Sequence, residues 1–182
     1  MSPSPAAGAA PMVDLAVETL ERFAAAFFHA AGPALTTSLN KPLTVQVTDV
    51  SATTFKTLLD DLDAPWAFIE MTYTRGMTGT HFLIVSRRNA LALAGDAGAE
   101  VMDLESRHKE AIRNTVNQLL HAAAPPLMPL FARSVAWAPV TVHVVARDEE
   151  LPGELPMDQR VWAARAQAQG EDLTIDVVLT ID

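Results

Sequence analysis

A line of polar residues at helical spacing is the strongest candidate for a functional site in this sequence. Glu110, Asn114, Asn117 and His121 stand at i, i+4, i+7 and i+11, so on an α-helix they lie almost in one line. A solvated helix face is the simplest explanation of such a line. Asparagine, however, is a poor mid-helix residue, and its carboxamide both donates and accepts hydrogen bonds. The two asparagines therefore indicate a role that retains them.

The helix that carries this line is predicted to run over 103–123, and Pro125-Pro126 is expected to break it. A final turn over 127–131 follows, and then a strand over 135–145 in which Pro139 leaves a gap in the ladder. A closing hairpin is predicted over 161–168 and 173–179. The expected buried stripe of the helix consists of Leu104, Ile112, Val116, Leu119 and Leu120.

The first half of the chain shows a similar succession of elements. A long helix is predicted to begin near Asp14, a suitable N-cap, and to kink or restart at Gly32-Pro33. Strands follow wherever the apolar period changes to two residues, and a glycine-bearing turn over 75–79 joins two of them. The predicted strands are 43–48, 66–73 and 81–85, and the predicted short helices are 51–62 and 89–94.

The two halves match when the chain is shifted by 117 − 25 = 92 positions. His29 then falls on His121 and Pro33 on Pro125, while apolar positions fall on apolar positions. The predicted fold class is therefore α+β, a pseudo-two-fold repeat with one antiparallel sheet packed against two long helices. We expect a disordered tail over 1–12 and a single domain over 13–182, with halves of about 13–98 and 103–182.

Composition excludes several classes of function. The chain has no cysteine, which removes disulfides, thiolate metal sites and cysteine nucleophiles. A formal net charge of −9 argues against nucleic acid or an anionic membrane as partner. No apolar run reaches the ~18 residues of a membrane span, and no signal peptide is seen. We expect a cytoplasmic protein without cofactor or metal ion, since no histidine stands at a metal-ligand spacing.

Three segments carry a resemblance to a known family. They are NKPLTVQV over 40–47, MTGTHFLIV over 77–85 and EAIRNTVN over 110–117. With the helices around them, they make the chain similar to the CheC, CheX and FliY proteins of bacterial chemotaxis and to the related middle domain of FliM. The resemblance covers about 13–182 and implies a CheC-like, pseudo-two-fold fold.

The resemblance also implies an activity, because active members of this family are phosphatases of the phosphorylated response regulator CheY. Their signature is an acid, two residues and an asparagine on the long helix, with a proline downstream. The asparagine orients the attacking water, and the acid contacts a lysine of the regulator. Here Asn117 matches the asparagine, but neutral Asn114 occupies the acid position, and Pro139 is one residue off. In the first half the corresponding residues are Arg22 and Ala25, so no site is expected there.

Three functions remain open at this point. The first is a binding module for a CheY-type regulator or another chemotaxis or flagellar protein, with little or no hydrolysis. The second is a working phosphatase with a degenerate site, in which Asn117 orients water and Glu110 or Asn114 serves for docking. The third is a structural subunit similar to the FliM middle domain. Enzyme activity is therefore left open.

Overall fold

The structure is a computed structural model that describes residues 9–62, 64–101, 103–146, 155 and 157–181. The elements in chain order are α1 (Ala9–Leu39), β1 (Thr44–Thr54), α2 (Phe55–Asp60), β2 (Trp66–Arg75), β3 (Thr80–Ser86), α3 (Arg87–Leu93), α4 (Ser106–Phe131), β4 (Ala136–Trp137), β5 (Thr141–Val145), β6 (Arg160–Gln169) and β7 (Thr174–Ile181). The predicted tail lies outside the described residues over 1–8, and the predicted domain limits stay predictions. No described helix is long and apolar enough to cross a membrane.

All the strands join one antiparallel sheet in the order β1-β6-β7-β3-β2, with β4 and β5 both paired to β2 at the far edge. The order is symmetric between the two halves of the chain. If β1, β2 and β3 of the first half exchange places with β5, β6 and β7 of the second, the same order is obtained, read from the other edge. A two-fold repeat requires this symmetry. The gap between β4 and β5 contains Pro139, where the sequence predicted an interrupted ladder. The arrangement has the predicted antiparallel sheet and two long helices.

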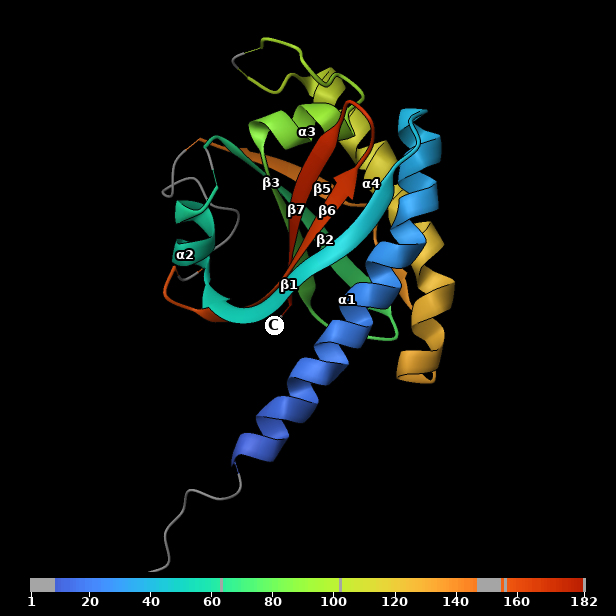
Figure 1. The fold of residues 1–182 in the computed structure, drawn as a ribbon, viewed down its shortest axis with the longest axis vertical. Coiled ribbons are helices and arrows are strands. Elements are labelled where there is room, and N and C mark those ends of the chain that lie inside the picture. The colour runs from blue at the N-terminus through green and yellow to red at the C-terminus, as the bar shows by residue number, and fades with distance from the viewer. Residues whose placement is uncertain (1–8, 63, 102, 147–154, 156, 182) are drawn as a thin grey trace, which may run out of the picture.

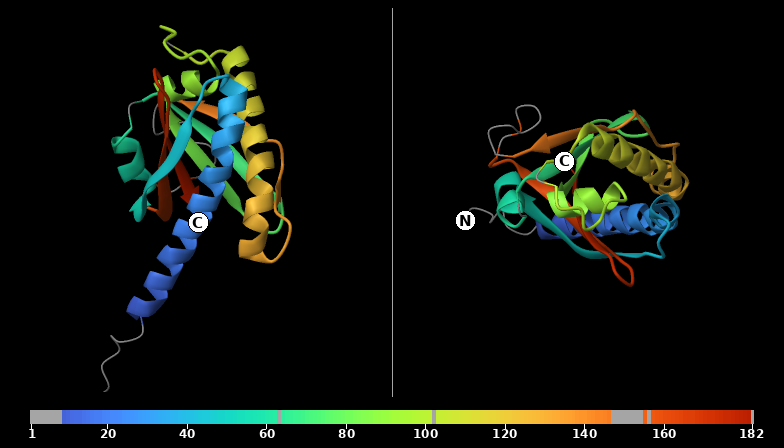
Figure 2. Two further views of the ribbon diagram at one scale, coloured as in Figure 1. Left: turned by 45° about the vertical axis from the view of Figure 1, so that its right-hand side comes forward. Right: turned by 90° about the horizontal axis from the view of Figure 1, so that it is seen from above.

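The two long helices cover one face of the sheet, and α2 covers part of the other (Figure 1; Figure 2, left). Along β2, Ala67, Ile69 and Met71 face the long helices, while Trp66 and Phe68 face α2. This strand is buried on both faces over most of its length and is accordingly apolar at nearly every position. The larger core therefore lies between the sheet and the α1–α4 pair.

Both long helices continue through their prolines, so the predicted break at Pro125-Pro126 is wrong, and the helix does not restart at Gly32-Pro33. Ala123 and Leu127, on either side of the proline pair, are fully buried, whereas the prolines lie on the exposed side. Packing thus holds the backbone in helical form, and the carbonyls that lose a helical donor face water. Likewise α1 begins at Ala9 rather than near Asp14.

The first short helix also begins later than predicted, at Phe55 instead of residue 51. Residues 51–54 extend β1, which pairs with β6 as far as Thr54. The Thr54 side chain then caps α2 by accepting a hydrogen bond from the Thr57 N–H at 3.2 Å. A run of β-branched threonines therefore ends the strand and starts the helix.

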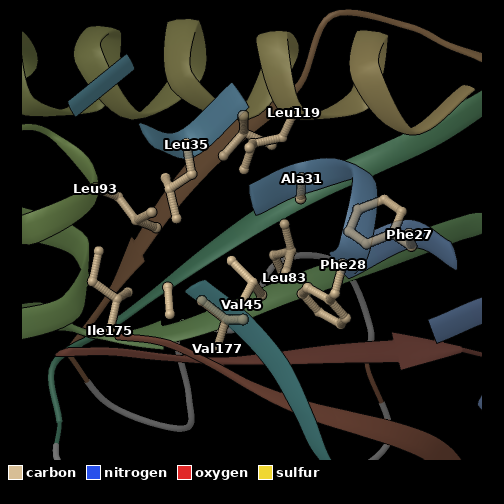
Figure 3. Close-up of a pocket in the computed structure, with 12 residues that line it drawn as sticks. Phe27, Phe28, Ala31, Leu35, Val45, Leu83, Leu93, Leu119, Ile175 and Val177 are labelled. Atoms are coloured by element: carbon tan, nitrogen blue, oxygen red, sulfur yellow. The ribbon is translucent and has the colours of Figure 1, made fainter. Parts of the chain in front are cut away.

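A small cavity of about 30 Å³ lies in the larger core, between α1, α4 and the sheet (Figure 3). All of its lining residues are apolar: Phe27, Phe28, Ala31, Leu35, Val45, Leu83, Leu93, Val116, Leu119, Ala168, Ile175 and Val177. A buried water needs two to four polar partners, and these side chains offer none. The cavity is therefore a packing defect of the core.

Candidate functional site

The predicted polar line lies on the outward face of α4. Glu110, Asn114 and His121 are exposed, and Asn117 is half-buried. The opposite face of the helix is buried, including Ile112, Val116, Leu119 and Leu120. The structure thus brings the predicted site residues together on one helix face, and it leaves Arg22 and Ala25 exposed on α1.

The start of α4 is fixed by a buried histidine. His108 is 2% exposed, and its Nδ1 accepts a hydrogen bond from the Glu105 N–H at 3.0 Å. Because Nδ1 accepts, Nε2 carries a proton and donates to Asp96 Oδ2 at 3.0 Å. About two turns further on, the Thr115 hydroxyl donates to the Leu93 carbonyl at 3.2 Å. These bonds set the rotation of α4, and with it the direction in which the polar line faces.

Asn117 is tied to the strand edge beside the helix. The Val140 N–H, which follows Pro139 in the gap between β4 and β5, donates a hydrogen bond to Asn117 Oδ1 at 3.2 Å. Sequence reasoning identified Asn117 and Pro139 separately and missed this contact. The available signal was the proline itself, since an interrupted ladder leaves a neighbouring backbone N–H in need of another acceptor.

A groove runs between the C-terminal half of α4 and the β4–β5 edge. Its polar lining consists of Asn117 and His121, and its wall on the strand side includes Trp137 and Pro139. The other lining residues are Leu120, Ala124, Pro125, Val135, Ala136 and Ala138. A second, shallower hollow on the helix surface is lined by Asn117, Gln118, His121 and Ala122. Asn117 therefore stands where both depressions meet.

Val135, one of the residues that line the groove, lies against the backbone at Gly76. Gly76 has φ +88°, and a Cβ added there would lie 2.6 Å from the Ser134 carbonyl oxygen and 3.1 Å from the Val135 Cα. We expect Gly76→Ala to destabilise the protein by about 2–3 kcal/mol, because the backbone at the groove wall must move as well as adopt a strained φ.

The matched control is Gly79→Ala, at φ +106° with nothing within 4 Å of an added Cβ. This substitution should lower the free energy of unfolding by the backbone strain alone, about 1–2 kcal/mol. Urea unfolding of the three proteins measures both effects, and equal losses would show that the contact with Ser134 is unimportant.

Chemically, the site offers hydrogen-bonding groups and few charges. Two carboxamides share the face with one carboxylate and one imidazole. Within the described residues there is no group of three or more His, Asp or Glu side chains that could hold a metal ion. The arrangement can bind and orient a polar or anionic group, and it supplies no activated nucleophile.

Comparison with known proteins points to one family. The chain is 26% identical over 128 residues to the flagellar motor switch phosphatase FliY of Bacillus subtilis, covering 68% of this chain and 34% of that protein. The chain thus spans about a third of the length of that relative. No family model matches the sequence.

Solved structures with the same fold include FliY of Thermotoga maritima, with a TM-score of 0.77, 18% identity and coverage of 100% of this chain and 92% of that one. FliM in a FliG–FliM complex from H. pylori gives a TM-score of 0.70 at 11% identity, over 90% and 92% of the two chains. A CheC-like superfamily protein from Shewanella gives a TM-score of 0.58 at 9% identity, over 87% of this chain and 96% of that one. The CheC-like fold is confirmed.

Proposed function

Because the chain is a CheC/CheX/FliY-family protein whose fold is related to the FliM middle domain, we propose that it binds a CheY-type phosphorylated response regulator through the outward face of α4. Its phosphatase motif is incomplete, so we expect binding with little or no hydrolysis. One observation carries this proposal. Asn114, in the acid position, is exposed and neutral, and the oxygen of Asn117 on the same helix face already accepts a hydrogen bond from Val140.

The polar line suits a partner that presents an anionic group. Carboxamide N–H groups donate to phosphoryl oxygens, and such bonds to an ionised acceptor are stronger than bonds between neutral groups. The groove beside Asn117 adds apolar surface from Trp137 and Pro139 on which a partner side chain can pack. Glu110, one turn from Asn114, is the remaining acid that can reach a lysine of the regulator.

Phosphate release from a phosphorylated CheY-type regulator of the same cell tests the proposal, with binding measured on the same samples. We expect the wild-type protein to bind the phosphorylated regulator without accelerating phosphate release, and Asn117→Ala to bind it about tenfold more weakly. Acceleration by the wild type that is lost in Asn117→Ala would favour the second function, a phosphatase with a degenerate site. Absence of binding would reject the regulator as partner.

A substitution that restores the acid should strengthen binding. We expect Asn114→Glu to raise the affinity for the regulator about tenfold, because a carboxylate at this position can pair with the regulator's lysine. Ala25→Glu is the control, since it adds the same charge at an exposed position of α1. The effect should weaken as salt rises. Equal affinities of the two variants would show that net charge, rather than position 114, matters.

A second candidate, a FliM-like structural subunit of a flagellar switch, is favoured by the fold match to FliM in the FliG–FliM complex. The matching partner would be a FliG-type protein, and a direct binding measurement with FliG of the same cell tests it. Binding of FliG that is unchanged in Asn117→Ala, together with no binding of the regulator, would support this candidate over the first.

A further inference from the structure

The orientation of the Asn117 carboxamide is determined by its partner. A backbone N–H can only donate, so the Asn117 atom 3.2 Å from the Val140 nitrogen must be the carbonyl oxygen, Oδ1. The amide nitrogen, Nδ2, then points in a different direction, because the two atoms diverge from the same carbon. The usual ambiguity between oxygen and nitrogen in an asparagine side chain is thereby removed.

Nδ2 of Asn117 is not completely buried. Over the described ranges no hydrogen bond from this nitrogen is formed, and no buried side-chain nitrogen or oxygen lacks a partner. An unbonded Nδ2 is therefore not buried. It belongs to a residue that lines both the groove and the shallower hollow, together with His121. The face of α4 thus presents a hydrogen-bond donor at this position, while the acceptor is turned toward the strand edge.

We propose that the Val140 N–H is a positioning group that holds the Asn117 carboxamide with its oxygen inward and its amino group outward, so that the site recognises an anionic phosphoryl group instead of orienting water for its hydrolysis. This inference rests on the proposed function for the identity of the ligand, and on the structure alone for the positioning. A carboxamide that acts as the acceptor for an attacking water must use its oxygen, because the amide nitrogen only donates.

The reaction that the site would otherwise support is hydrolysis of an aspartyl phosphate. The water oxygen bonds to phosphorus, the bond from phosphorus to the carboxylate oxygen breaks, and the water's proton leaves with the phosphate or to solvent. Recognition requires only donors to the phosphoryl oxygens. A carboxamide held by Val140 presents its amino group as such a donor, while its oxygen, the acceptor that hydrolysis needs, is engaged by the backbone N–H and turned toward the strand edge.

The positioning itself can be measured without any partner. We expect the Val140 amide to exchange with solvent deuterium at least about tenfold more slowly in the wild type and in Asn117→Asp than in Asn117→Ala, because only the first two offer an oxygen acceptor. Similar exchange rates in all three proteins would overturn the positioning. Hydrogen exchange resolved by NMR supplies these rates, and the result stands even if no regulator binds.

The same variants separate donor from acceptor in binding. Asn117→Asp keeps an acceptor for Val140 but has no N–H to donate, so its preference for the phosphorylated over the unphosphorylated regulator should fall at least about tenfold from that of the wild type. An unchanged preference would overturn the donor role of Nδ2. Weak binding of both regulator forms by every variant would instead count against the proposed function.

Removal of the Val140 N–H should release the oxygen. In the Asn114→Glu background, replacing the peptide N–H of Val140 by an ester oxygen leaves the side chain in place and abolishes the donor. We expect this protein to accelerate phosphate release at least about tenfold over Asn114→Glu alone. Val140→Pro in the same background is the genetic counterpart. Equal rates with and without the N–H, whether fast or slow, would overturn the proposal.

Discussion

Leu35→Ala is expected to lower the free energy of unfolding by about 4 kcal/mol, near the upper part of the range for buried leucines. Leu35 is 5% exposed on α1 and lines the apolar cavity between the long helices and the sheet (Figure 3). Shortening this side chain removes apolar contacts and enlarges a cavity that already holds about 30 Å³. The surrounding residues have not closed this space around the wild-type side chain, so they should relax little around the smaller one.

Leu15→Ala is the matched control, because it is the same substitution on the same helix at a side chain that is 65% exposed. It should change the free energy of unfolding by less than about 0.5 kcal/mol. Urea or guanidinium unfolding followed by circular dichroism measures both, with the slope m checked for two-state behaviour. If Leu35→Ala lowers the free energy of unfolding no more than the control does, the packing of α1 against the sheet contributes little to stability.

The second large effect is a loss of stability in acid that originates at His81. This residue is 4% exposed on β3, and its Nδ1 lies 3.1 Å from the Tyr73 hydroxyl oxygen. Burial lowers the pKa of His81 from 6.5 to about 4, because the charged imidazolium loses its hydration. Burial also raises the pKa of Tyr73, so the hydroxyl stays neutral and offers no charge to stabilise the imidazolium.

The sign of the effect follows from the depressed pKa. Between about pH 6.5 and about pH 4 the unfolded chain binds a proton at His81 that the folded protein does not, so stability rises with pH in this window. The contribution is fully present above about pH 6.5 and is lost as the pH falls to about 4. The loss amounts to about 3 kcal/mol at 1.36 kcal/mol per pKa unit.

His81→Gln removes the titrating group, and glutamine can still accept a hydrogen bond from Tyr73. The free energy of unfolding, measured at a series of pH values, should therefore depend less on pH for His81→Gln than for the wild type between pH 6.5 and 4. This expectation holds even if the two proteins differ in stability at neutral pH. His29→Gln, at an exposed position of α1, is the control and should keep the wild-type profile. A wild-type slope in His81→Gln would assign the acid sensitivity to other groups.

The sequence by itself determined the elements whose signals are local. The 3.6-residue period of α4 predicted which face carries Glu110, Asn114 and Asn117, and that face is outward in the structure. Alternation with a period of two predicted the strand over 43–48, because neighbouring residues on a strand must face opposite sides of the sheet, and β1 covers this segment from Thr44 on. The shift of 92 positions between His29 and His121 predicted the repeat, and the strand order has the matching symmetry.

Only the tertiary structure decided the features that depend on packing between distant segments. Prolines normally end helices, yet α1 and α4 continue through theirs because buried neighbours such as Ala123 and Leu127 hold the backbone against the core. The Val140 hydrogen bond to Asn117 joins residues 23 positions apart, and no periodicity encodes it. His81 is buried because Phe23 of α1 and Tyr73 of β2 pack against its ring. Each of these outcomes arises from side chains that meet only once the sheet and helices have assembled.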